Sequence, residues 1–129
     1  MTPSAYEMIM EARRLIDLGW TQEAFARNAA GAEVSAFSHF AVRWSLTGAL
    51  DAATARHPTR CLEARIAVHA ALHARDATSE ELWNDDPART QADALALLDD
   101  ALPRRVSAAG GEVLRAPERG VERFSETCS

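Results

Sequence analysis

Hydrophobic residues recur at the spacing of amphipathic helices in four segments of this chain. The first helix is predicted to open at Ser4, which has the spacing of a capping box with Glu7, and to close at Gly19, where we expect a positive φ. Its predicted buried face consists of Ala5, Met8, Ile9, Ala12, Leu15 and Ile16.

The second helix is predicted at about 38–56 and the third at about 59–75, after a break at His57-Pro58. Gly48 lies in the middle of the second helix, where glycine costs about 1 kcal/mol relative to alanine. We expect close approach of another helix, or of Trp83, to offset this cost. Apolar residues wrap most of the third helix, which we therefore predict to be the central, most buried one.

The fourth helix is predicted to begin at Thr90, which forms a capping box with Asp93. Pro103 ends it, because proline has no backbone N–H and its ring clashes with the preceding turn. Upstream, Ser79 is predicted to cap a single turn that ends near Trp83, and residues 84–87 are predicted to form a loop.

Residues 20–34 have a different pattern. Asn28 and Gly31 lie around a short gap between apolar residues, which favours a tight hairpin. The alternative is a short helix over 21–28 that ends near Gly31, and we prefer the hairpin.

These elements predict an all-α or mainly α fold, a compact four-helix domain with a short hairpin or irregular excursion after the first helix. Residues 1–103 are expected to form this single domain. Residues 104–129 contain scattered Gly, Pro, Ser and charged residues, which predicts a flexible tail, with a docked short helix at 118–124 as an option.

The composition restricts the partners and the location. The net charge is −5, the pI is near 5.3, and all 14 basic residues are arginine. This acidity argues against binding to nucleic-acid backbones but is compatible with a partner protein that has a basic surface. No apolar run is long enough to span a bilayer, and we interpret Cys61 and Cys128 as reduced thiols. We therefore expect a cytoplasmic protein without nucleic-acid or membrane partners.

Two histidines are a weak sign of a metal site. His69 and His73 are four residues apart, so their rings would share one helix face. Only the tertiary fold could add a third ligand, from Asp76, Glu63 or His57, and two histidines at the edge of a core helix are the commoner case. The chain also has no Gly-rich phosphate loop and no Gly-x-Ser-x-Gly elbow. We therefore predict no cofactor, assign no catalytic residue and favour a non-enzyme.

Three tryptophans mark the candidate binding residues. Trp20, Trp44 and Trp83 either form a shared aromatic cluster in the core, which we favour, or line a pocket for a small ligand or peptide. Arg89 can pair with the carboxylates of the nearby loop or bind an outside anion. The candidate residues for binding a ligand or partner are Trp83, Asn84, Asp85, Arg89, Gln22 and Arg43.

Three groups of segments form a recognisable pattern. They are Gly19-Trp20-Thr21-Gln22 with Ala24-Phe25-Ala26-Arg27, Ala41-Val42-Arg43-Trp44 with Gly48-Ala49-Leu50, and Trp83-Asn84-Asp85 with Arg89-Thr90-Gln91-Ala92 and Leu95-Ala96-Leu97-Leu98-Asp99. This pattern resembles a family of small, uncharacterised bacterial proteins over residues 8–102. Members often have cysteine where this chain has Ser45, which argues against a thiol-based role here. The resemblance implies a common fold but no activity and no catalytic residue.

Together these observations favour a non-catalytic interaction or regulatory module that binds another protein. The alternative is a small-ligand-binding protein or an enzyme with a site near Trp83 and Arg89. A third hypothesis is a homo-oligomer formed through Gly48, Ala52 and Ala55 of the second predicted helix.

Overall fold

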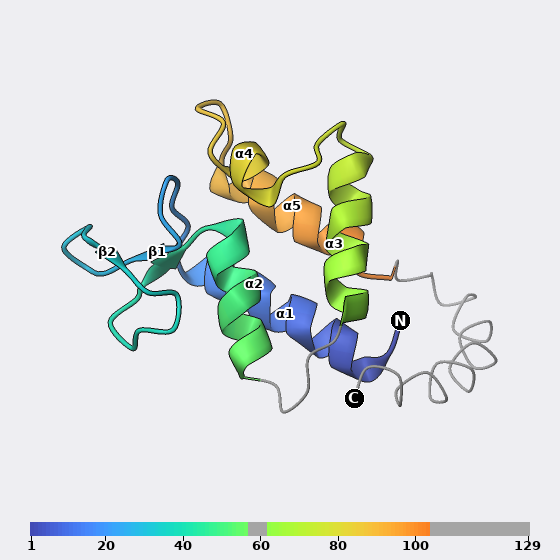
Figure 1. Cartoon of the computed structure of the whole chain (residues 1–129), viewed down its shortest axis with the longest axis horizontal. Helices are drawn as coiled ribbons and strands as arrows, with labels where there is room; N and C mark the ends of the chain where they lie inside the picture. The colour runs from blue at the N-terminus through green and yellow to red at the C-terminus, as the bar shows by residue number, and fades with distance from the viewer. Residues whose placement is uncertain (57–61, 104–129) are drawn as a thin grey trace.

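The computed structural model describes residues 1–56 and 62–103, and this part of the chain is mainly helical (Figure 1). It contains five helices and one antiparallel sheet with strand order β2-β1-β3. A mainly α fold with an excursion after the first helix is as predicted, whereas the all-α, four-helix description is too simple. In chain order the elements are α1 (Pro3–Leu18), β1 (Ala26–Arg27), β2 (Glu33–Val34), β3 (Arg43–Trp44), α2 (Leu46–Ala55), α3 (Leu62–His73), α4 (Glu80–Asn84) and α5 (Gln91–Ala101).

Some predictions concern residues outside these two described ranges. They are the tail at 104–129 with its short helix, the break at His57-Pro58, the start of the third helix at residue 59, and both cysteines. Within the described ranges, no helix combines the length and the apolar character needed to cross a membrane.

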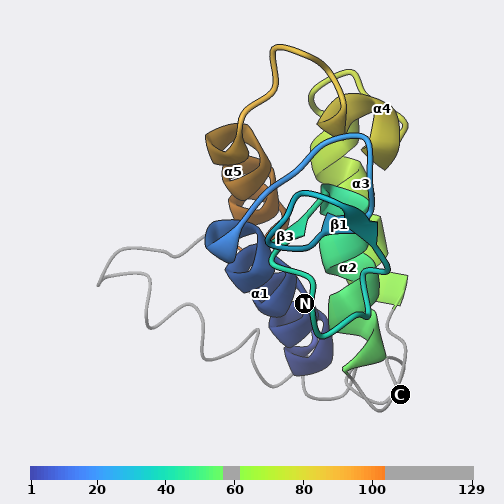
Figure 2. The same cartoon turned by 90° about the vertical axis from the view of Figure 1, so that its left-hand side faces the viewer.

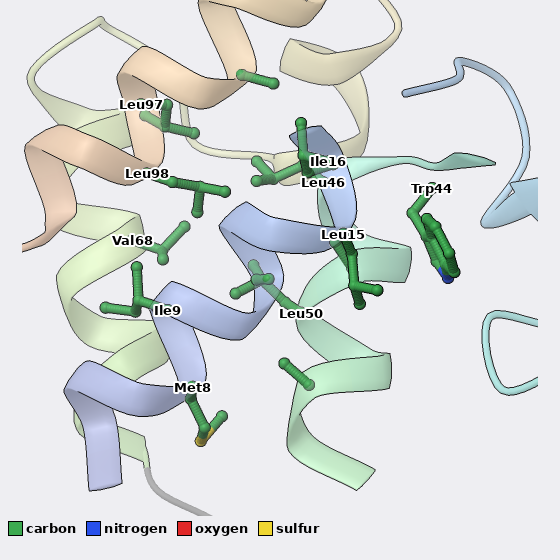
Figure 3. Packing of buried hydrophobic residues seen from close by; sticks show 14 of the residues in the cluster. Met8, Ile9, Leu15, Ile16, Trp44, Leu46, Leu50, Val68, Leu97 and Leu98 are labelled. Atoms are coloured by element: carbon green, nitrogen blue, oxygen red, sulfur yellow. The ribbon is translucent and has the colours of Figure 1, made fainter. Parts of the chain in front are cut away.

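Helix α1 lies at the centre of the core and packs against α2, α3, α5 and β3. Its buried face is the predicted one, and its largest side chains, Met8, Ile9, Leu15 and Ile16, are at most 1% exposed. Figure 3 shows them among Leu46 and Leu50 of α2, Val68 of α3, and Leu97 and Leu98 of α5. Full burial of one such side chain contributes roughly 1.5–3 kcal/mol, so this face holds the bundle together.

The prediction that the third helix is the most buried one is wrong. Helix α3 buries one face, which consists of Ala64, Val68, Ala71 and Leu72. On its outer face, Leu62 is 76% exposed and Ile66 is 65% exposed. The reason is position, because α3 lies at the edge of the bundle and packs against α1, α4 and α5 (Figure 1). Its apolar residues exceed what one contact face can bury.

Both ends of α1 differ from the prediction. Thr2 rather than Ser4 is the N-cap, since the Thr2 hydroxyl accepts a hydrogen bond from the backbone N–H of Ala5 at 3.2 Å. Gly19 has a φ of −177°, which is extended backbone and not the expected positive φ. Glycine is required there for space, because a Cβ would lie 2.3 Å from the carbonyl oxygen of Val42.

Glu11 binds Arg14 of its own helix and links α1 to the end of α2 through Arg56. Its carboxylate accepts hydrogen bonds from Arg14 at 2.8 and 2.9 Å and pairs with Arg56. The hydrogen bonds from Arg14, with the help of Arg56, hold the pKa of Glu11 below its usual value. The Glu11 carboxylate is therefore protonated at a higher pH in the unfolded chain than in the native state. The resulting stabilisation is fully present above the unfolded-state pKa of about 4.3 and is lost as the pH falls through the lowered native pKa.

We expect Glu11→Gln to lower the free energy of unfolding by about 0.5–1 kcal/mol at pH 7 and to have little effect at pH 2. Urea unfolding followed by circular dichroism at both pH values measures the difference. Glu7→Gln is the matched control, because Glu7 is exposed on the same helix and forms no ion pair with the described residues. An equal loss of stability at pH 7 and pH 2 would contradict the ion-pair explanation.

Residues 20–44, here called the excursion, project from one end of the helical bundle in Figure 1 and face the viewer in Figure 2. The predicted hairpin is confirmed, since β1 and β2 pair antiparallel with Ala26 opposite Val34. The strand β3 was not predicted. It pairs with the other edge of β1 and places Trp44 opposite Ala26. The excursion is thus a three-stranded unit anchored on the core through Ala26 and Trp44, which are both buried.

The second helix is shorter than predicted. Helix α2 begins at Leu46, after Ser45, whose hydroxyl accepts a hydrogen bond from the backbone N–H of Gly48 at 3.0 Å. Further upstream, the hydroxyls of Ser35 and Ser38 accept hydrogen bonds from the backbone two residues later. Such local turns compete with a helix, so residues 38–44 form loop and strand.

The small residues of the proposed oligomer face are largely buried within the chain's own fold. Gly48 and Ala52 belong to the buried side of α2, and a Cβ on Gly48 would lie 1.9 Å from the carbonyl oxygen of Phe25. The close approach expected at Gly48 is confirmed, but its neighbour is the excursion backbone rather than a helix or Trp83. A homo-oligomer stays a prediction and needs another face.

The elements around Thr90 follow the sequence closely. Ser79 caps α4 by accepting a hydrogen bond from the backbone N–H of Leu82 at 3.2 Å. Thr90 and Asp93 form the complete capping box at the start of α5, with reciprocal hydrogen bonds of 3.2 and 3.0 Å. The helix ends at Ala101, shortly before Pro103, as expected.

Candidate functional site

Asn84 is the centre of a polar network that joins the excursion to α2 and α4. Its side chain is 1% exposed. Its Oδ1 accepts hydrogen bonds from Trp20 Nε1 at 2.8 Å and from the backbone N–H of Leu46 at 3.1 Å. Its Nδ2 donates to the carbonyl oxygen of Thr21 and to Asp85 Oδ1, both at 3.1 Å. All donor and acceptor positions of the amide are therefore occupied by the chain itself.

Gln22 and Asp85 fasten the first loop of the excursion to the end of α4. The Nε2 group of Gln22 donates to the carbonyl oxygens of Asn84 at 2.9 Å and Asp86 at 2.7 Å. Asp85 Oδ1 accepts a hydrogen bond from the backbone N–H of Glu23 at 2.9 Å. Glu23 has a φ of 61°. This left-handed conformation costs roughly 1–2 kcal/mol for a residue other than glycine, and the bond to Asp85 helps to hold it.

Arg89 lies over Trp83 and bonds to the same loop. Its Nε donates to the carbonyl oxygen of Trp83 at 2.9 Å, and its guanidinium carbon lies 4.1 Å from the centre of the Trp83 ring. Its Nη2 lies 3.8 Å from the Asp86 carboxylate, which confirms the predicted pairing with a loop carboxylate. The guanidinium is thus engaged in shaping the turn that carries Asn84.

A cavity of about 190 Å³ lies beside this stacked pair. Two guanidinium groups, those of Arg75 and Arg89, line it together with Trp83, Asp93 and Ala96. Its volume is below the range of about 300–1,000 Å³ that is usual for small-molecule sites. A small anion is therefore the class of ligand that this cavity could hold.

Five of the six candidate binding residues lie together. Gln22, Asn84 and Asp85 are in direct contact, and Trp83 and Arg89 adjoin them. Arg43 lies apart on β3, where it forms no hydrogen bond or ion pair with the described residues through its side chain. Its Cγ instead occupies the space beside Gly19. That these residues bind a ligand or partner stays a prediction.

The three tryptophans do not form a shared aromatic cluster. Among the described residues, no two tryptophan rings are in stacking contact. Trp44 Nε1 donates to the carbonyl oxygen of Ala36 at 3.3 Å, whereas the Trp20 indole bonds to Asn84. Trp20 and Trp44 are joined by a backbone bridge instead. The indoles of Trp20 and Trp44 therefore hold different parts of the excursion in place.

Glu80 forms a second buried network, which the sequence did not reveal. Its side chain is 8% exposed and accepts hydrogen bonds from Thr47 at 2.8 Å and from Arg65 at 2.9 and 3.0 Å. His69 Nε2 lies 3.0 Å from Oε2 of Glu80. Arg65 also pairs with Asp51. The contacts join α2, α3 and α4. In sequence, Glu80 resembles an ordinary acidic residue in the first turn of a helix, so its partners could not be predicted.

The Glu80 network also includes His69, one of the two histidines that were a weak sign of a metal site. His69 faces Glu80, while His73 is exposed one turn later. Within residues 1–56 and 62–103, no three histidine, cysteine or acidic side chains are grouped closely enough to hold a metal ion. The carboxylate of Glu80 is already engaged by a hydroxyl and a guanidinium of the chain.

An open cavity of about 280 Å³ lies where the excursion meets α4. Glu23, Phe25 and Glu33 of the excursion line it, together with Glu81 and the candidate residues Asn84 and Asp85. Asn84 and Asp85 are candidate residues predicted from the sequence, whereas the other lining residues are not. No local pattern could have revealed them, because these side chains meet only when the hairpin folds beside α4.

All the phenylalanines in the described part of the chain lie on the excursion and are exposed. Phe25, Phe37 and Phe40 are 51%, 65% and 64% exposed, and Val42 is 41% exposed. The core is built from aliphatic residues, methionine and two tryptophans, and it contains none of the described phenylalanines. Exposed aromatic residues on one segment are a feature of protein interaction surfaces.

Comparison with known proteins gives a family but no activity. No curated protein and no solved structure matches the chain. The sequence profile of one family of unknown function matches residues 1–104, which include every residue of the Asn84 network and of both cavities. This extent of match shows that the chain belongs to the family of unknown function DUF6197.

Proposed function

We propose that this protein is a non-catalytic, regulatory interaction module that binds another protein through its excursion. The observation that carries the proposal is the exposure of Phe25, Phe37 and Phe40 on this one segment. Phenylalanine is among the residues most often buried, and its exposure leaves a large apolar area in water. A partner that covers these rings would remove that area from water and gain the aromatic contacts that dominate many interfaces.

The rigidity of the excursion supports the same function. Its first loop is held by the hydrogen bonds of Gln22 and Asn84, and its strands are anchored by Ala26 and Trp44 in the core. Binding by a surface that is already ordered costs less conformational entropy than binding by a loose loop. The Asn84 network therefore serves the interaction by fixing the segment that carries the phenylalanines.

A cytoplasmic location in a bacterial cell is part of the proposal. It is supported by the acidic composition, with a net charge of −5, and by the use of only two cysteines. The same charge favours a partner with a basic surface over nucleic acid.

A small-ligand site at Trp83 and Arg89 is the second candidate, favoured by the two guanidinium groups at the cavity of about 190 Å³. The geometry supports it less well. Arg89 already stacks on Trp83 and bonds to its carbonyl oxygen, and Arg75 already pairs with Asp100. An anion would have to compete with these internal partners.

The double variant Phe37→Gln/Phe40→Gln tests the proposal. We expect it to retain the melting temperature of the original protein, because both rings are largely exposed, and to lose the partner. The measurement is affinity capture of the tagged full chain from an extract of its own host, with quantitative mass spectrometry of the bound proteins.

The variant Leu62→Gln/Ile66→Gln is the matched control, since it removes two equally exposed apolar side chains from α3. A protein that the original chain and the α3 variant both enrich, and that the phenylalanine variant loses, supports the proposal. The proposal is wrong if the phenylalanine variant enriches the same proteins as the original chain.

A further inference from the structure

The cavity between the excursion and α4 carries uncompensated negative charge. Glu23, Glu33, Glu81 and Asp85 all line it. Within the described part of the chain, none of these four carboxylates forms an ion pair with a basic residue. Elsewhere the fold pairs acidic side chains with arginines, as it does at Glu80. A concave surface lined by one sign of charge concentrates the field and attracts ions of the opposite sign.

The arrangement of the carboxylates favours an extended cation over a metal ion. Side chains from the excursion and from the α4 region line the cavity together. In the described ranges, no three histidine, cysteine or acidic side chains are grouped so that they could hold a metal ion. A guanidinium suits such a set of carboxylates, because it is planar and directs five N–H donors outward over several ångströms.

The apolar part of the wall favours a side chain of a protein over a free ion. Phe25 lines the cavity and its ring is 51% exposed. An aromatic face attracts a cation placed over it, and it also packs against the methylene groups that carry the charge. The volume of about 280 Å³ lies at the lower limit of small-molecule sites of about 300–1,000 Å³, which suits one inserted side chain.

We infer that this cavity receives an arginine side chain of the partner protein. The guanidinium lies among these four carboxylates, and its aliphatic stem lies against Phe25. This inference rests on the proposed function, because the partner is the protein bound by the excursion. It adds the chemistry that the partner presents, an arginine next to the apolar residues that cover Phe37 and Phe40.

The test uses N-acetyl-arginine amide and its neutral isostere, N-acetyl-citrulline amide, as probes of the full chain. Two-dimensional amide NMR at constant ionic strength measures the position and strength of binding. We expect saturable shifts at residues 23–25, 33 and 81–85 with the arginine probe, and binding weaker by about tenfold or more with the citrulline probe. The variant Glu33→Gln/Glu81→Gln should lose the preference for arginine, and it should fold because both side chains are exposed.

The variant Glu7→Gln/Asp17→Asn controls for net charge, because it removes two exposed carboxylates from α1. It should keep the preference for arginine. Equal binding of both probes, shifts centred outside the cavity, or no binding would overturn the inference. Any of these results would leave the proposed function intact, since capture that depends on Phe37 and Phe40 is measured separately. If the chain self-associates in sedimentation and Glu33→Gln/Glu81→Gln abolishes this association, the occupant of the cavity is a second copy of the chain. That result would also overturn the inference.

Discussion

Replacement of Asn84 by alanine is expected to lower the free energy of unfolding by about 4 kcal/mol, a large part of the stability of a small domain. The change leaves the Trp20 indole N–H, the Leu46 backbone N–H and the Thr21 carbonyl oxygen without their partner. Each unsatisfied buried group costs about 1–3 kcal/mol. Urea unfolding followed by tryptophan fluorescence measures the loss, and the emission of Trp20 should also change in the native state.

Asn28→Ala is the matched control for this prediction. Asn28 Oδ1 also accepts two hydrogen bonds, from the backbone of Ala30 and Ala32, but these lie at an exposed turn where water can replace the lost acceptor. We expect a loss of about 1 kcal/mol there. A third variant, Asn84→Asp, keeps the acceptor oxygen, removes the donor and adds a charge beside Asp85, so its stability should lie between the other two at neutral pH. If Asn84→Ala is no less stable than Asn28→Ala, the network around Asn84 does not hold the excursion.

The importance of Asn84 was only half visible in the sequence. The sequence correctly places Asn84 between the Ser79 cap and the Thr90 capping box, although it ends α4 and does not begin the predicted loop. Its hydrogen-bond partners at residues 20–22 are more than 60 positions away. Spacing patterns report contacts within one element, so they cannot reveal a partner that only the tertiary fold supplies.

The errors in the predicted fold have the same origin. Apolar character predicts burial and so places α3 at the centre, although Leu62 and Ile66 face outward. The pattern of residues 38–44 predicts helix, although they form a loop and then β3, which depends on pairing with β1. The hairpin itself was predictable, because the signal at Asn28 and Gly31 is local.

The candidate site shows most clearly which features of the folded chain a sequence pattern cannot reveal. Five of the six candidate residues do lie together, since they come from two short runs that the fold places side by side. The phenylalanines and the glutamates of the larger cavity are not among the candidates, because each is ordinary in its own stretch of sequence. Their exposure and their missing ion pairs are properties of the folded chain.

Replacement of Gly48 by alanine changes the free energy of unfolding, and the sign of this change distinguishes the effect of helix propensity from that of tertiary packing. Helix propensity alone predicts a gain of about 1 kcal/mol, because Gly48 lies inside α2. The fold predicts a loss of about 2–3 kcal/mol, as for other overpacked positions. A Cβ would lie 1.9 Å from the carbonyl oxygen of Phe25 and 2.8 Å from its carbonyl carbon, so the backbone of the excursion must move. The same carbonyl accepts a hydrogen bond from the backbone N–H of Ser45 at 3.0 Å, which the movement would break.

Gly31→Ala is the control, since Gly31 has a φ of 88° and a Cβ there meets no atom within 4 Å. Its expected loss is about 1–2 kcal/mol, from backbone conformation alone. Thermal and urea unfolding rank the two variants, and amide NMR shows whether residues 23–27 shift in Gly48→Ala alone. Because Phe25 follows the backbone that Gly48 supports, the same variant should weaken binding of the arginine probe while the variant at Gly31 leaves it unchanged. A more stable Gly48→Ala protein would mean that the excursion does not depend on its contact with α2, and the rigid surface on which the proposed interaction depends would have lost its support.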